Sequence, residues 1–206
     1  GTVTASGTPV ELSIPGNTTD GDRTVWFEYK WKDTWTQFEE TGRTQAKFVP
    51  PVVGDVVDGG VVYWVSGSDF RVVALDESQK PWAASSGYVL GSGAQSQSDR
   101  NGAAIMTLAK NYSAETSNGT TGTFATDFPA FGYCYNKTPE GTWYLPSFLE
   151  LTDLYAARGS VESVITDHNG TAFSADYYWS ATELSTSSRH AWVVYFGDGD
   201  TDYFNK

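Results

Sequence analysis

Two short runs of apolar and aromatic residues near the end of the chain, at 176–181 and 191–196, constrain the fold more than any other feature. Each run has the length and the aromatic and β-branched content of a strand. A polar segment at 182–190 separates them and predicts the loop of a hairpin. Residues 197–204 are small, acidic or aromatic without exception. We interpret both runs as scaffold, and the loop together with the last segment as a surface that contacts a ligand.

The composition of the 206 residues is typical of a loop-rich domain of extracellular type. Charged residues make up only 18%, whereas aromatic residues reach 15%, with 12 Tyr and 8 Trp. Tyr and Trp offer a large rigid contact area with a polar tip, and both are favoured at binding surfaces. The composition therefore favours a protein that binds a ligand.

The net charge of −12 narrows the choice of partner. Binding to nucleic acid depends on Lys and Arg at phosphates, so an acidic chain argues against it, and against docking on anionic membranes. No run approaches the roughly 20 apolar residues of a membrane span, and no signal-peptide pattern occurs. We expect an exported protein, at the cell surface or extracellular, whose signal or anchor lies outside this sequence.

Few residues are suited to catalysis. The two histidines, His168 and His190, both lie in polar segments that we expect to be exposed loops. No Gly-x-Ser-x-Gly nucleophile motif is present. The single cysteine, Cys134, excludes a disulfide framework within the chain and a Cys-based zinc cluster, and its aromatic neighbours predict a buried thiol on a strand. We therefore expect no enzymatic activity and no cofactor.

The first 49 residues predict a small all-β leader, either immunoglobulin-like or part of a sandwich. Alternation of apolar and polar residues indicates strands at 10–14, 25–31 and 34–40. Pro50-Pro51 then acts as a stiff linker. Residues 50–206 form the second predicted domain.

This second domain has the pattern of an α+β fold. Strands are predicted at 60–65 and 70–75, joined by a hairpin turn. The long loop at 78–100 has Trp82 and Tyr88 as its expected anchors. Asp99 is a candidate N-cap for a helix over 100–111. The apolar face expected for this helix consists of Ala104, Ile105, Leu108 and Ala109.

A capping box predicts a second helix. The Ser147 hydroxyl can accept from the amide of Glu150, whose carboxylate can accept from the amide of residue 147. The helix is expected over 148–157 and to end at Gly159. Its predicted buried residues are Leu151, Leu154 and Tyr155. Residues 160–175 are expected to be irregular, with a short helical turn at 161–166.

Three phrases together resemble the C-type-lectin-fold domain of bacterial surface proteins. They are Gly-Val-Val-Tyr-Trp-Val at 60–65, Trp-Tyr-Leu-Pro-Ser at 143–147 followed by Glu150-Leu151, and Tyr-Trp-Ser-Ala-Thr-Glu at 178–183. The last is followed by Ala191-Trp192. The resemblance covers about residues 55–206 and implies a C-type-lectin-like fold in which Trp179 and Trp192 belong to the core. It also implies a structural role for Glu183, which we expect to accept from backbone amides.

A narrower resemblance is to the variable proteins of diversity-generating retroelements, in which Asn codons near the C-terminus are randomised to retarget binding. Randomising the first two bases of an Asn codon cannot give Lys, Glu, Gln, Met or Trp, and none of these occurs at 195–205. With this composition, such a stretch arises by chance about one time in six. In the family a short strand with a Val-Arg pair follows the variable segment, and it has no counterpart before Lys206. The matching variable positions, which we take as ligand-binding candidates, are Tyr177, Ser187, Ser188, Arg189, His190, Val193, Tyr195, Gly197, Asp198, Asp200, Asp202, Tyr203 and Phe204.

Asp198, Asp200 and Asp202 stand at alternate positions, a spacing with which loops can supply calcium ligands. The Glu-Pro-Asn and Trp-Asn-Asp signatures of calcium-dependent sugar lectins are absent. We therefore expect a solvated or ligand-contacting acidic face, and a protein partner rather than a sugar. The alternatives are an adhesin or pilus-tip component that binds carbohydrate or mediates assembly, and an enzyme of the formylglycine-generating type, whose paired cysteines this chain lacks.

Overall fold

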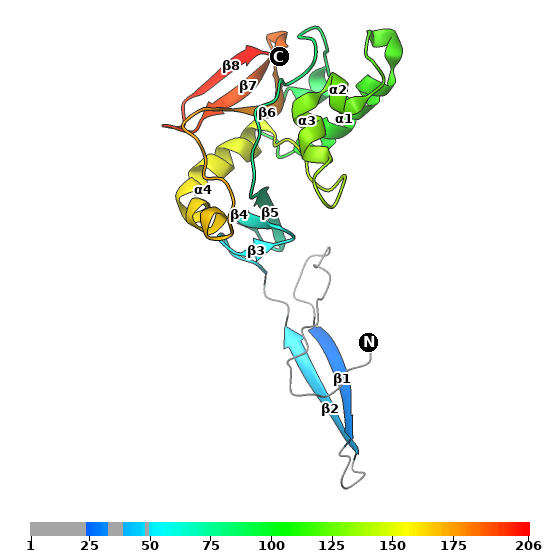
Figure 1. The fold of residues 1–206 in the computed structure, drawn as a ribbon, viewed down its shortest axis with the longest axis vertical. Coiled ribbons are helices and arrows are strands. Elements are labelled where there is room, and N and C mark those ends of the chain that lie inside the picture. Colours follow the sequence, from blue (N-terminus) through cyan, green and yellow to red (C-terminus); the bar gives the residue numbers. More distant parts are fainter. Residues whose placement is uncertain (1–23, 33–38, 48–49) are drawn as a thin grey trace. The chain divides into compact units, whose positions relative to one another are not determined.

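A computed structural model describes the backbone of residues 24–32 and 39–47 and the full residues 50–206 (Figure 1). The described part divides into two units. One contains β1, β2 and the hairpin tip Val65–Asp69, and the other contains Val52–Trp64 and Phe70–Lys206. Within the described residues, no helix is both long and apolar enough to cross a membrane.

In the first unit, β1 (Thr24–Lys32) pairs antiparallel with β2 (Glu39–Lys47). The strand predicted at 25–31 is confirmed. The strand predicted at 34–40 overlaps β2 by two residues, and β2 continues through polar residues because antiparallel pairing along the backbone needs no apolar alternation. The strand predicted at 10–14 and residues 34–38 lie outside the described residues.

A three-stranded sheet in the order β3-β4-β5 comprises Val56–Val57, Gly60–Ser66 and Asp69–Ala74, and all of it except the hairpin tip belongs to the second unit. The predicted hairpin is confirmed, and Gly67, with φ of +61°, forms its turn. A left-handed backbone there favours Gly because Gly has no Cβ.

The first long helix, α1 (Gly102–Ala114), is preceded by the 3-10 turn η1 (Ser92–Ala94) and confirms the predicted helix. The predicted cap is wrong, because the N-cap residue is Asn101 and its side chain does not bond to the helix. The Gly102 amide instead donates to Glu150, 3.1 Å away on another helix. Ala104 is exposed, and the buried residues are Gly102, Ile105, Met106, Ala109 and Ser113.

The segment predicted as a strand around Cys134 is helical. A 3-10 turn η2 (Thr116–Asn118) and the short helix α2 (Phe124–Asp127) lead into α3 (Pro129–Tyr135). Pro129 lies at the start of α3, where proline fits because its missing N–H has no partner within a helix. Apolar runs this short do not distinguish a strand from a buried helix, which is why the prediction was wrong.

The capping box of Ser147 and Glu150 is confirmed at the start of α4 (Phe148–Asp167). The helix does not end at Gly159 but runs on through the segment predicted as irregular. Leu154, Val161 and Ile165 are spaced by seven and four residues and are all buried, so the apolar face continues past Gly159. Burial of that face outweighs the roughly 1 kcal/mol penalty of a glycine in a helix.

The C-terminal sheet has the order β6-β7-β8: Tyr177–Leu184, Ser187–Tyr195 and Thr201–Asn205. The two predicted strands are confirmed, but the loop predicted at 182–190 is only the two-residue turn at 185–186. The other polar residues of the predicted loop extend β6 and β7, because strands pair through backbone hydrogen bonds whatever their side chains. Thr182 and Glu183, which were predicted to lie in the loop, are buried.

Two apolar clusters hold this unit together, and α4 lies between its two sheets (Figure 1). One cluster joins Val61 and Tyr63 of β4 to Leu154 of α4 and Val194 of β7. The other cluster contains residues of α1, α3, β6 and β7, which pack around Trp82. Trp82 is fully buried and Tyr88 is 8% exposed, so both predicted loop anchors are confirmed. The mixed α+β architecture is confirmed.

Candidate ligand-binding site

The C-terminal sheet divides the predicted ligand-binding residues between its two faces. Tyr177 lies opposite Tyr195, Val193 opposite Asp202, and Ala191 opposite Phe204. Side chains alternate along a strand, so these residues share one face. His190, Trp192 and Tyr203 belong to the other. The sequence did not predict this division, because the hairpin register was unknown.

Three aromatic rings gather on the first face, and we call Tyr177, Tyr195 and Phe204 the aromatic trio. The ring centroid of Tyr177 lies 4.9 Å from that of Tyr195 and 4.8 Å from that of Phe204. Tyr177 and Phe204 stand on the outer strands and meet across β7, where Val193 is only 1% exposed. Tyr177 and Phe204 remain 43% and 37% exposed, so their outer sides face solvent. Val193 supports the trio and is not itself accessible.

On the second face, Tyr203 contacts His190 and Trp192, with centroid separations of 5.5 and 5.8 Å. Trp192 also packs on Phe148 of α4 at 5.0 Å, but it is half-buried and belongs to neither apolar cluster, so it is less enclosed than the core residue that the resemblance implies. His190 Nδ1 lies 2.8 Å from Ser187 Oγ. His190 therefore lies on a strand. The sequence analysis had predicted an exposed loop at this position, and that prediction is wrong.

The other predicted residues lie at the two ends of the sheet. Ser188 and Arg189 are on β7 near the 185–186 turn, where the Lys206 amide donates to the Arg189 carbonyl. Gly197, Asp198 and Asp200 form the β7–β8 connection at the opposite end. The Tyr195 amide donates to the Asp200 carbonyl at 2.8 Å, and Gly199 has φ of +89°.

The three alternate aspartates do not converge on a common point. The Asp198 carboxylate accepts from the Asp200 amide, and the Asp202 carboxylate accepts from the Tyr203 amide. Among the described residues, no group of three or more His, Cys, Asp or Glu side chains could hold a metal ion.

A buried ion pair fixes β8 and β6 to the long loop. Glu183 accepts from the amides of Leu90 and Gly91, at 2.9 and 3.1 Å, and this agrees with its expected role. The Lys206 ammonium lies 2.6 Å from the same carboxylate, and both side chains are fully buried. Burial lowers the pKa of Lys206 despite the opposite effect of Glu183. The ion pair thus connects the β8 edge of the sheet to β6 and to the long loop.

A pocket of about 1110 Å³ adjoins two members of the aromatic trio, Tyr177 and Phe204. Tyr177, Trp179, Val193 and Phe204 form its sheet wall. The opposite walls come from the segment after β5, from α3, and from residues 142–146. The exposed contact candidates Tyr177 and Phe204 therefore border a cavity slightly larger than the roughly 300–1,000 Å³ of typical small-molecule sites.

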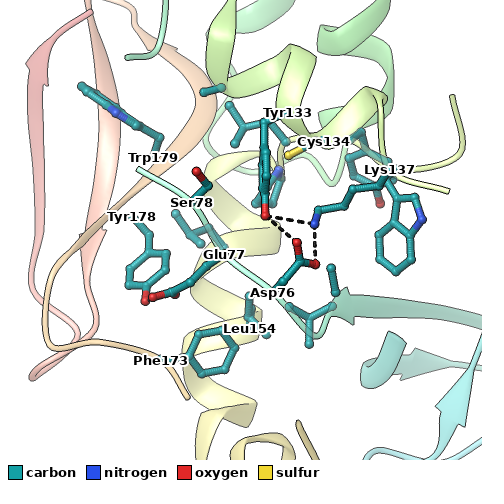
Figure 2. Close-up of a pocket in the computed structure, with 18 of the residues that line it drawn as sticks. Asp76, Glu77, Ser78, Tyr133, Cys134, Lys137, Leu154, Phe173, Tyr178 and Trp179 are labelled. Atoms are coloured by element: carbon teal, nitrogen blue, oxygen red, sulfur yellow. Dashed lines mark hydrogen bonds and ion pairs between the residues drawn. The ribbon is translucent and has the colours of Figure 1, made fainter. Parts of the chain in front are cut away.

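Charged and hydroxyl groups converge on one wall of this pocket. The Tyr133 hydroxyl donates to Asp76 at 2.7 Å, and the Lys137 ammonium lies 2.5 Å from the other Asp76 oxygen (Figure 2). Burial would raise the pKa of Asp76, but the bonds from Lys137 and Tyr133 lower it overall. Burial and the Asp76 bond raise the pKa of Tyr133. These shifts stabilise a charged Asp76 and a neutral Tyr133 at neutral pH.

Two further groups of the pocket are also held in their protonated forms. The Tyr178 hydroxyl donates to Glu77 and accepts from the Ser174 amide, and burial together with Glu77 raises its pKa to about 12. Burial raises the pKa of the Cys134 thiol to about 12. A thiol at neutral pH is a weak nucleophile, so Cys134 is not activated for attack.

The sequence reasoning missed this polar wall. Tyr133 and Lys137 are four residues apart; Tyr133 lies in the last turn of α3 and Lys137 just beyond its end, and their side chains meet at 3.1 Å. The strand prediction around Cys134 concealed that spacing, and Pro129 was the signal that could have revealed the helix. Asp76 follows β5 and is distant from both in the sequence, so its place was decided by tertiary contacts.

Comparison of the chain with family models, with curated proteins and with solved structures found no match.

Proposed function

We propose that this chain is a non-enzymatic, surface-displayed ligand-binding module that contacts a protein partner through the face of its C-terminal sheet that carries the aromatic trio. One observation carries the proposal. In the described residues, the exposed large apolar or aromatic side chains are Val52, Val53, Val56, Tyr177, Tyr203 and Phe204. All three aromatic residues in that set belong to the predicted contact positions, and two of them, Tyr177 and Phe204, lie on the face of the trio. Exposed aromatic residues on a rigid support are typical of binding surfaces.

The proposed fold is C-type-lectin-like. The α+β architecture, the order of its two long helices, and a C-terminal sheet held by a buried acidic residue of the Tyr-Trp-Ser-Ala-Thr-Glu phrase are compatible with it. In this proposal the frame consists of α1, α4 and the inner residues of β6 and β7. The contact surface consists of the exposed positions of β6 and β8.

The proposal includes variability of that surface by a diversity-generating retroelement. Asp198, Asp200, Asp202, Tyr203 and Phe204 are exposed, and substitutions at exposed sites away from special features usually change stability by less than about 0.5 kcal/mol. The nucleotide sequence around the gene tests this part. We expect a reverse transcriptase and a near-repeat of the 3′ coding segment with adenines at the variable codons; without them, the retargeting hypothesis is wrong.

Panning a library of random peptides displayed on phage against the purified chain tests the binding function. Selected clones are then measured against Tyr177→Ala/Phe204→Ala, which removes two exposed rings of the trio. Truncating two central aromatic contacts is expected to weaken binding at least tenfold.

The matched control is Val52→Ala/Val53→Ala, which removes two apolar side chains that are 61% and 42% exposed outside the sheet. Clones that bind both double variants equally well would contradict the proposed surface.

A second function, carbohydrate binding by an adhesin or pilus-tip component, is favoured by one feature of the pocket. Aromatic rings and polar groups such as Asp76 and Gln79 line it together, and sugar sites combine these same groups. A glycan array with and without calcium distinguishes the two functions. Sugar binding that Tyr177→Ala/Phe204→Ala abolishes would overturn the preference for a protein partner.

A further inference from the structure

The end of the sheet that carries the aromatic trio is also acidic. Asp176 precedes Tyr177, and its carbonyl accepts from the Phe196 amide at 2.9 Å. Asp200 is bonded to the Tyr195 backbone, and Asp202 shares the face of Phe204. Four exposed aspartates, the fourth being Asp198, therefore lie on or beside the strands that carry the three aromatic rings.

These carboxylates have no ion-pair partner among the described residues. The described ion pairs involve Arg71, Arg100, Lys137, Arg158 and Lys206, each bound to a different acidic residue elsewhere. One cation lies at this end of the sheet, because the Arg158 guanidinium donates to the Phe196 carbonyl and also pairs with Glu162 of its own helix. Arg158 is already paired with Glu162, and none of the four aspartates forms an ion pair within the described residues.

The rings of the trio also have no cation over them. The cation–π contacts of the described residues use Trp64, Trp82, Tyr133 and Tyr135. An arginine that stacks on an exposed aromatic ring and bonds to a neighbouring carboxylate gains from both interactions. The face of Tyr177 and Phe204 beside Asp202 offers both to one side chain.

From this charge complementarity we infer that the occupant of the sheet face is a cationic segment of a partner protein, rich in Arg and Lys. The inference rests on the proposed function and specifies the chemistry of its partner. Long-range attraction to the acidic end would guide the segment to the site, and stacking on the trio would hold it there. Binding would weaken as salt screens the charges.

Fluorescence anisotropy with labelled nonamers of arginine, glutamate and glycine-serine tests the inference. The charge variant is Asp198→Asn/Asp200→Asn/Asp202→Asn, in which each Asn keeps an oxygen for the amide bonds of Asp198 and Asp202. The control is Asp69→Asn/Glu115→Gln/Asp167→Asn, which removes the same charge at exposed positions outside this sheet.

We expect the arginine nonamer to bind the unchanged chain and the other two nonamers not to bind. The charge variant should weaken binding about tenfold, because it removes up to three surface ion pairs with the peptide. The control should weaken binding less than about twofold. Tyr177→Ala/Phe204→Ala should also weaken it. Equal losses in the charge variant and the control would show attraction to overall acidity and would overturn the inference, as would no binding at all.

The peptide panning distinguishes a failure of the cationic-partner inference from a failure of the proposed binding function. If selected clones depend on Tyr177 and Phe204 but are not enriched in Arg and Lys, the binding function stands and the cationic partner is wrong. If no clone depends on these rings, the proposed function itself is wrong.

Discussion

The interior carboxylate of Glu150 and the sheet carboxylate of Asp202 have opposite surroundings. Glu150 is 1% exposed and accepts from Arg71, Tyr144, Gly102 and Ser147. Asp202 is exposed and accepts from the amide of its neighbour Tyr203. Glu150 connects the N-termini of α1 and α4, whereas Asp202 connects nothing beyond its own strand. Buried acids in this unit build the frame, and the exposed acids of the sheet are available to a partner.

Removing Glu150 is expected to have the largest effect. Glu150→Ala leaves the Gly102 amide and the Arg71 guanidinium without their carboxylate, and breaking a buried pair in this way costs about 3–5 kcal/mol. Urea denaturation followed by circular dichroism measures the loss. The control is Glu162→Ala, whose partly exposed pair with Arg158 should contribute about 0.5 kcal/mol or less. Equal losses in both variants would remove the distinction between buried and exposed acids.

The second effect concerns the ion pair of Glu183 and Lys206. Lys206→Met should destabilise the folded state by about 3 kcal/mol, because the Glu183 carboxylate stays buried without its cation. The double variant Glu183→Gln/Lys206→Met should recover part of that loss, since no unpaired charge remains. Thermal unfolding of the two single variants and the double variant gives the coupling energy. Losses that simply add would show that the pair does not act as a unit.

The buried carboxylate of Asp127 allows the contribution of a buried acid to stability to be measured as a function of pH. Burial raises its pKa, but bonds from Ser113 at 2.6 Å and from the Thr121 amide at 2.8 Å lower it below the ordinary value. Its contribution is therefore present above the unfolded-state pKa of about 3.9 and is lost as the pH falls through the lower folded-state pKa.

Asp127→Asn should consequently cost about 1–3 kcal/mol at neutral pH, the contribution of hydrogen bonds to a charged group. The difference in unfolding free energy between the unchanged chain and the variant should shrink below about pH 4. Urea titrations from pH 3 to 7 measure this. A difference that stays constant over the whole range would show that the charge of Asp127 contributes nothing.

The smallest effect on stability is expected at the sheet. Asp198→Asn/Asp200→Asn/Asp202→Asn removes three exposed charges and keeps their amide bonds, so the unfolding free energy should change by less than about 0.5 kcal/mol. Reduced repulsion between like charges favours a slight gain. Thermal unfolding at low salt measures it. A loss of several kcal/mol would place these aspartates in the frame and remove their proposed availability to a partner.

Part of the fold could be predicted from local patterns. The capping box of Ser147 and Glu150, the hairpin of β4 and β5, and the strands on either side of the 185–186 turn depend on neighbours in the sequence. The predictions that were wrong share a cause. The end of α4 and the helical state of α3 depend on burial against distant residues, which outweighs weak local preferences.

The candidate site divides in the same way. Composition alone indicated a binding surface rich in Tyr and Asp near the C-terminus. The register of β6, β7 and β8 decided which of those residues share a face, and thus that Tyr177 and Phe204 meet over a covered Val193 while Tyr203 faces the other way. The pocket beside them depends on Asp76, Tyr133 and Trp179, which are far apart in the sequence.

The sequence by itself determined the types of residue available for contact, the α+β class and several element positions, because these follow from composition and short-range periodicity. The tertiary structure decided which carboxylates are enclosed and which are exposed. Glu150 and Asp202 carry the same charge, and the sequence around each does not give the number of donors that folding brings to it. The most distant donor to Glu150 is Arg71, 79 residues away in the sequence, so the number of donors depends on tertiary packing. It distinguishes the frame of this protein from the surface proposed to bind.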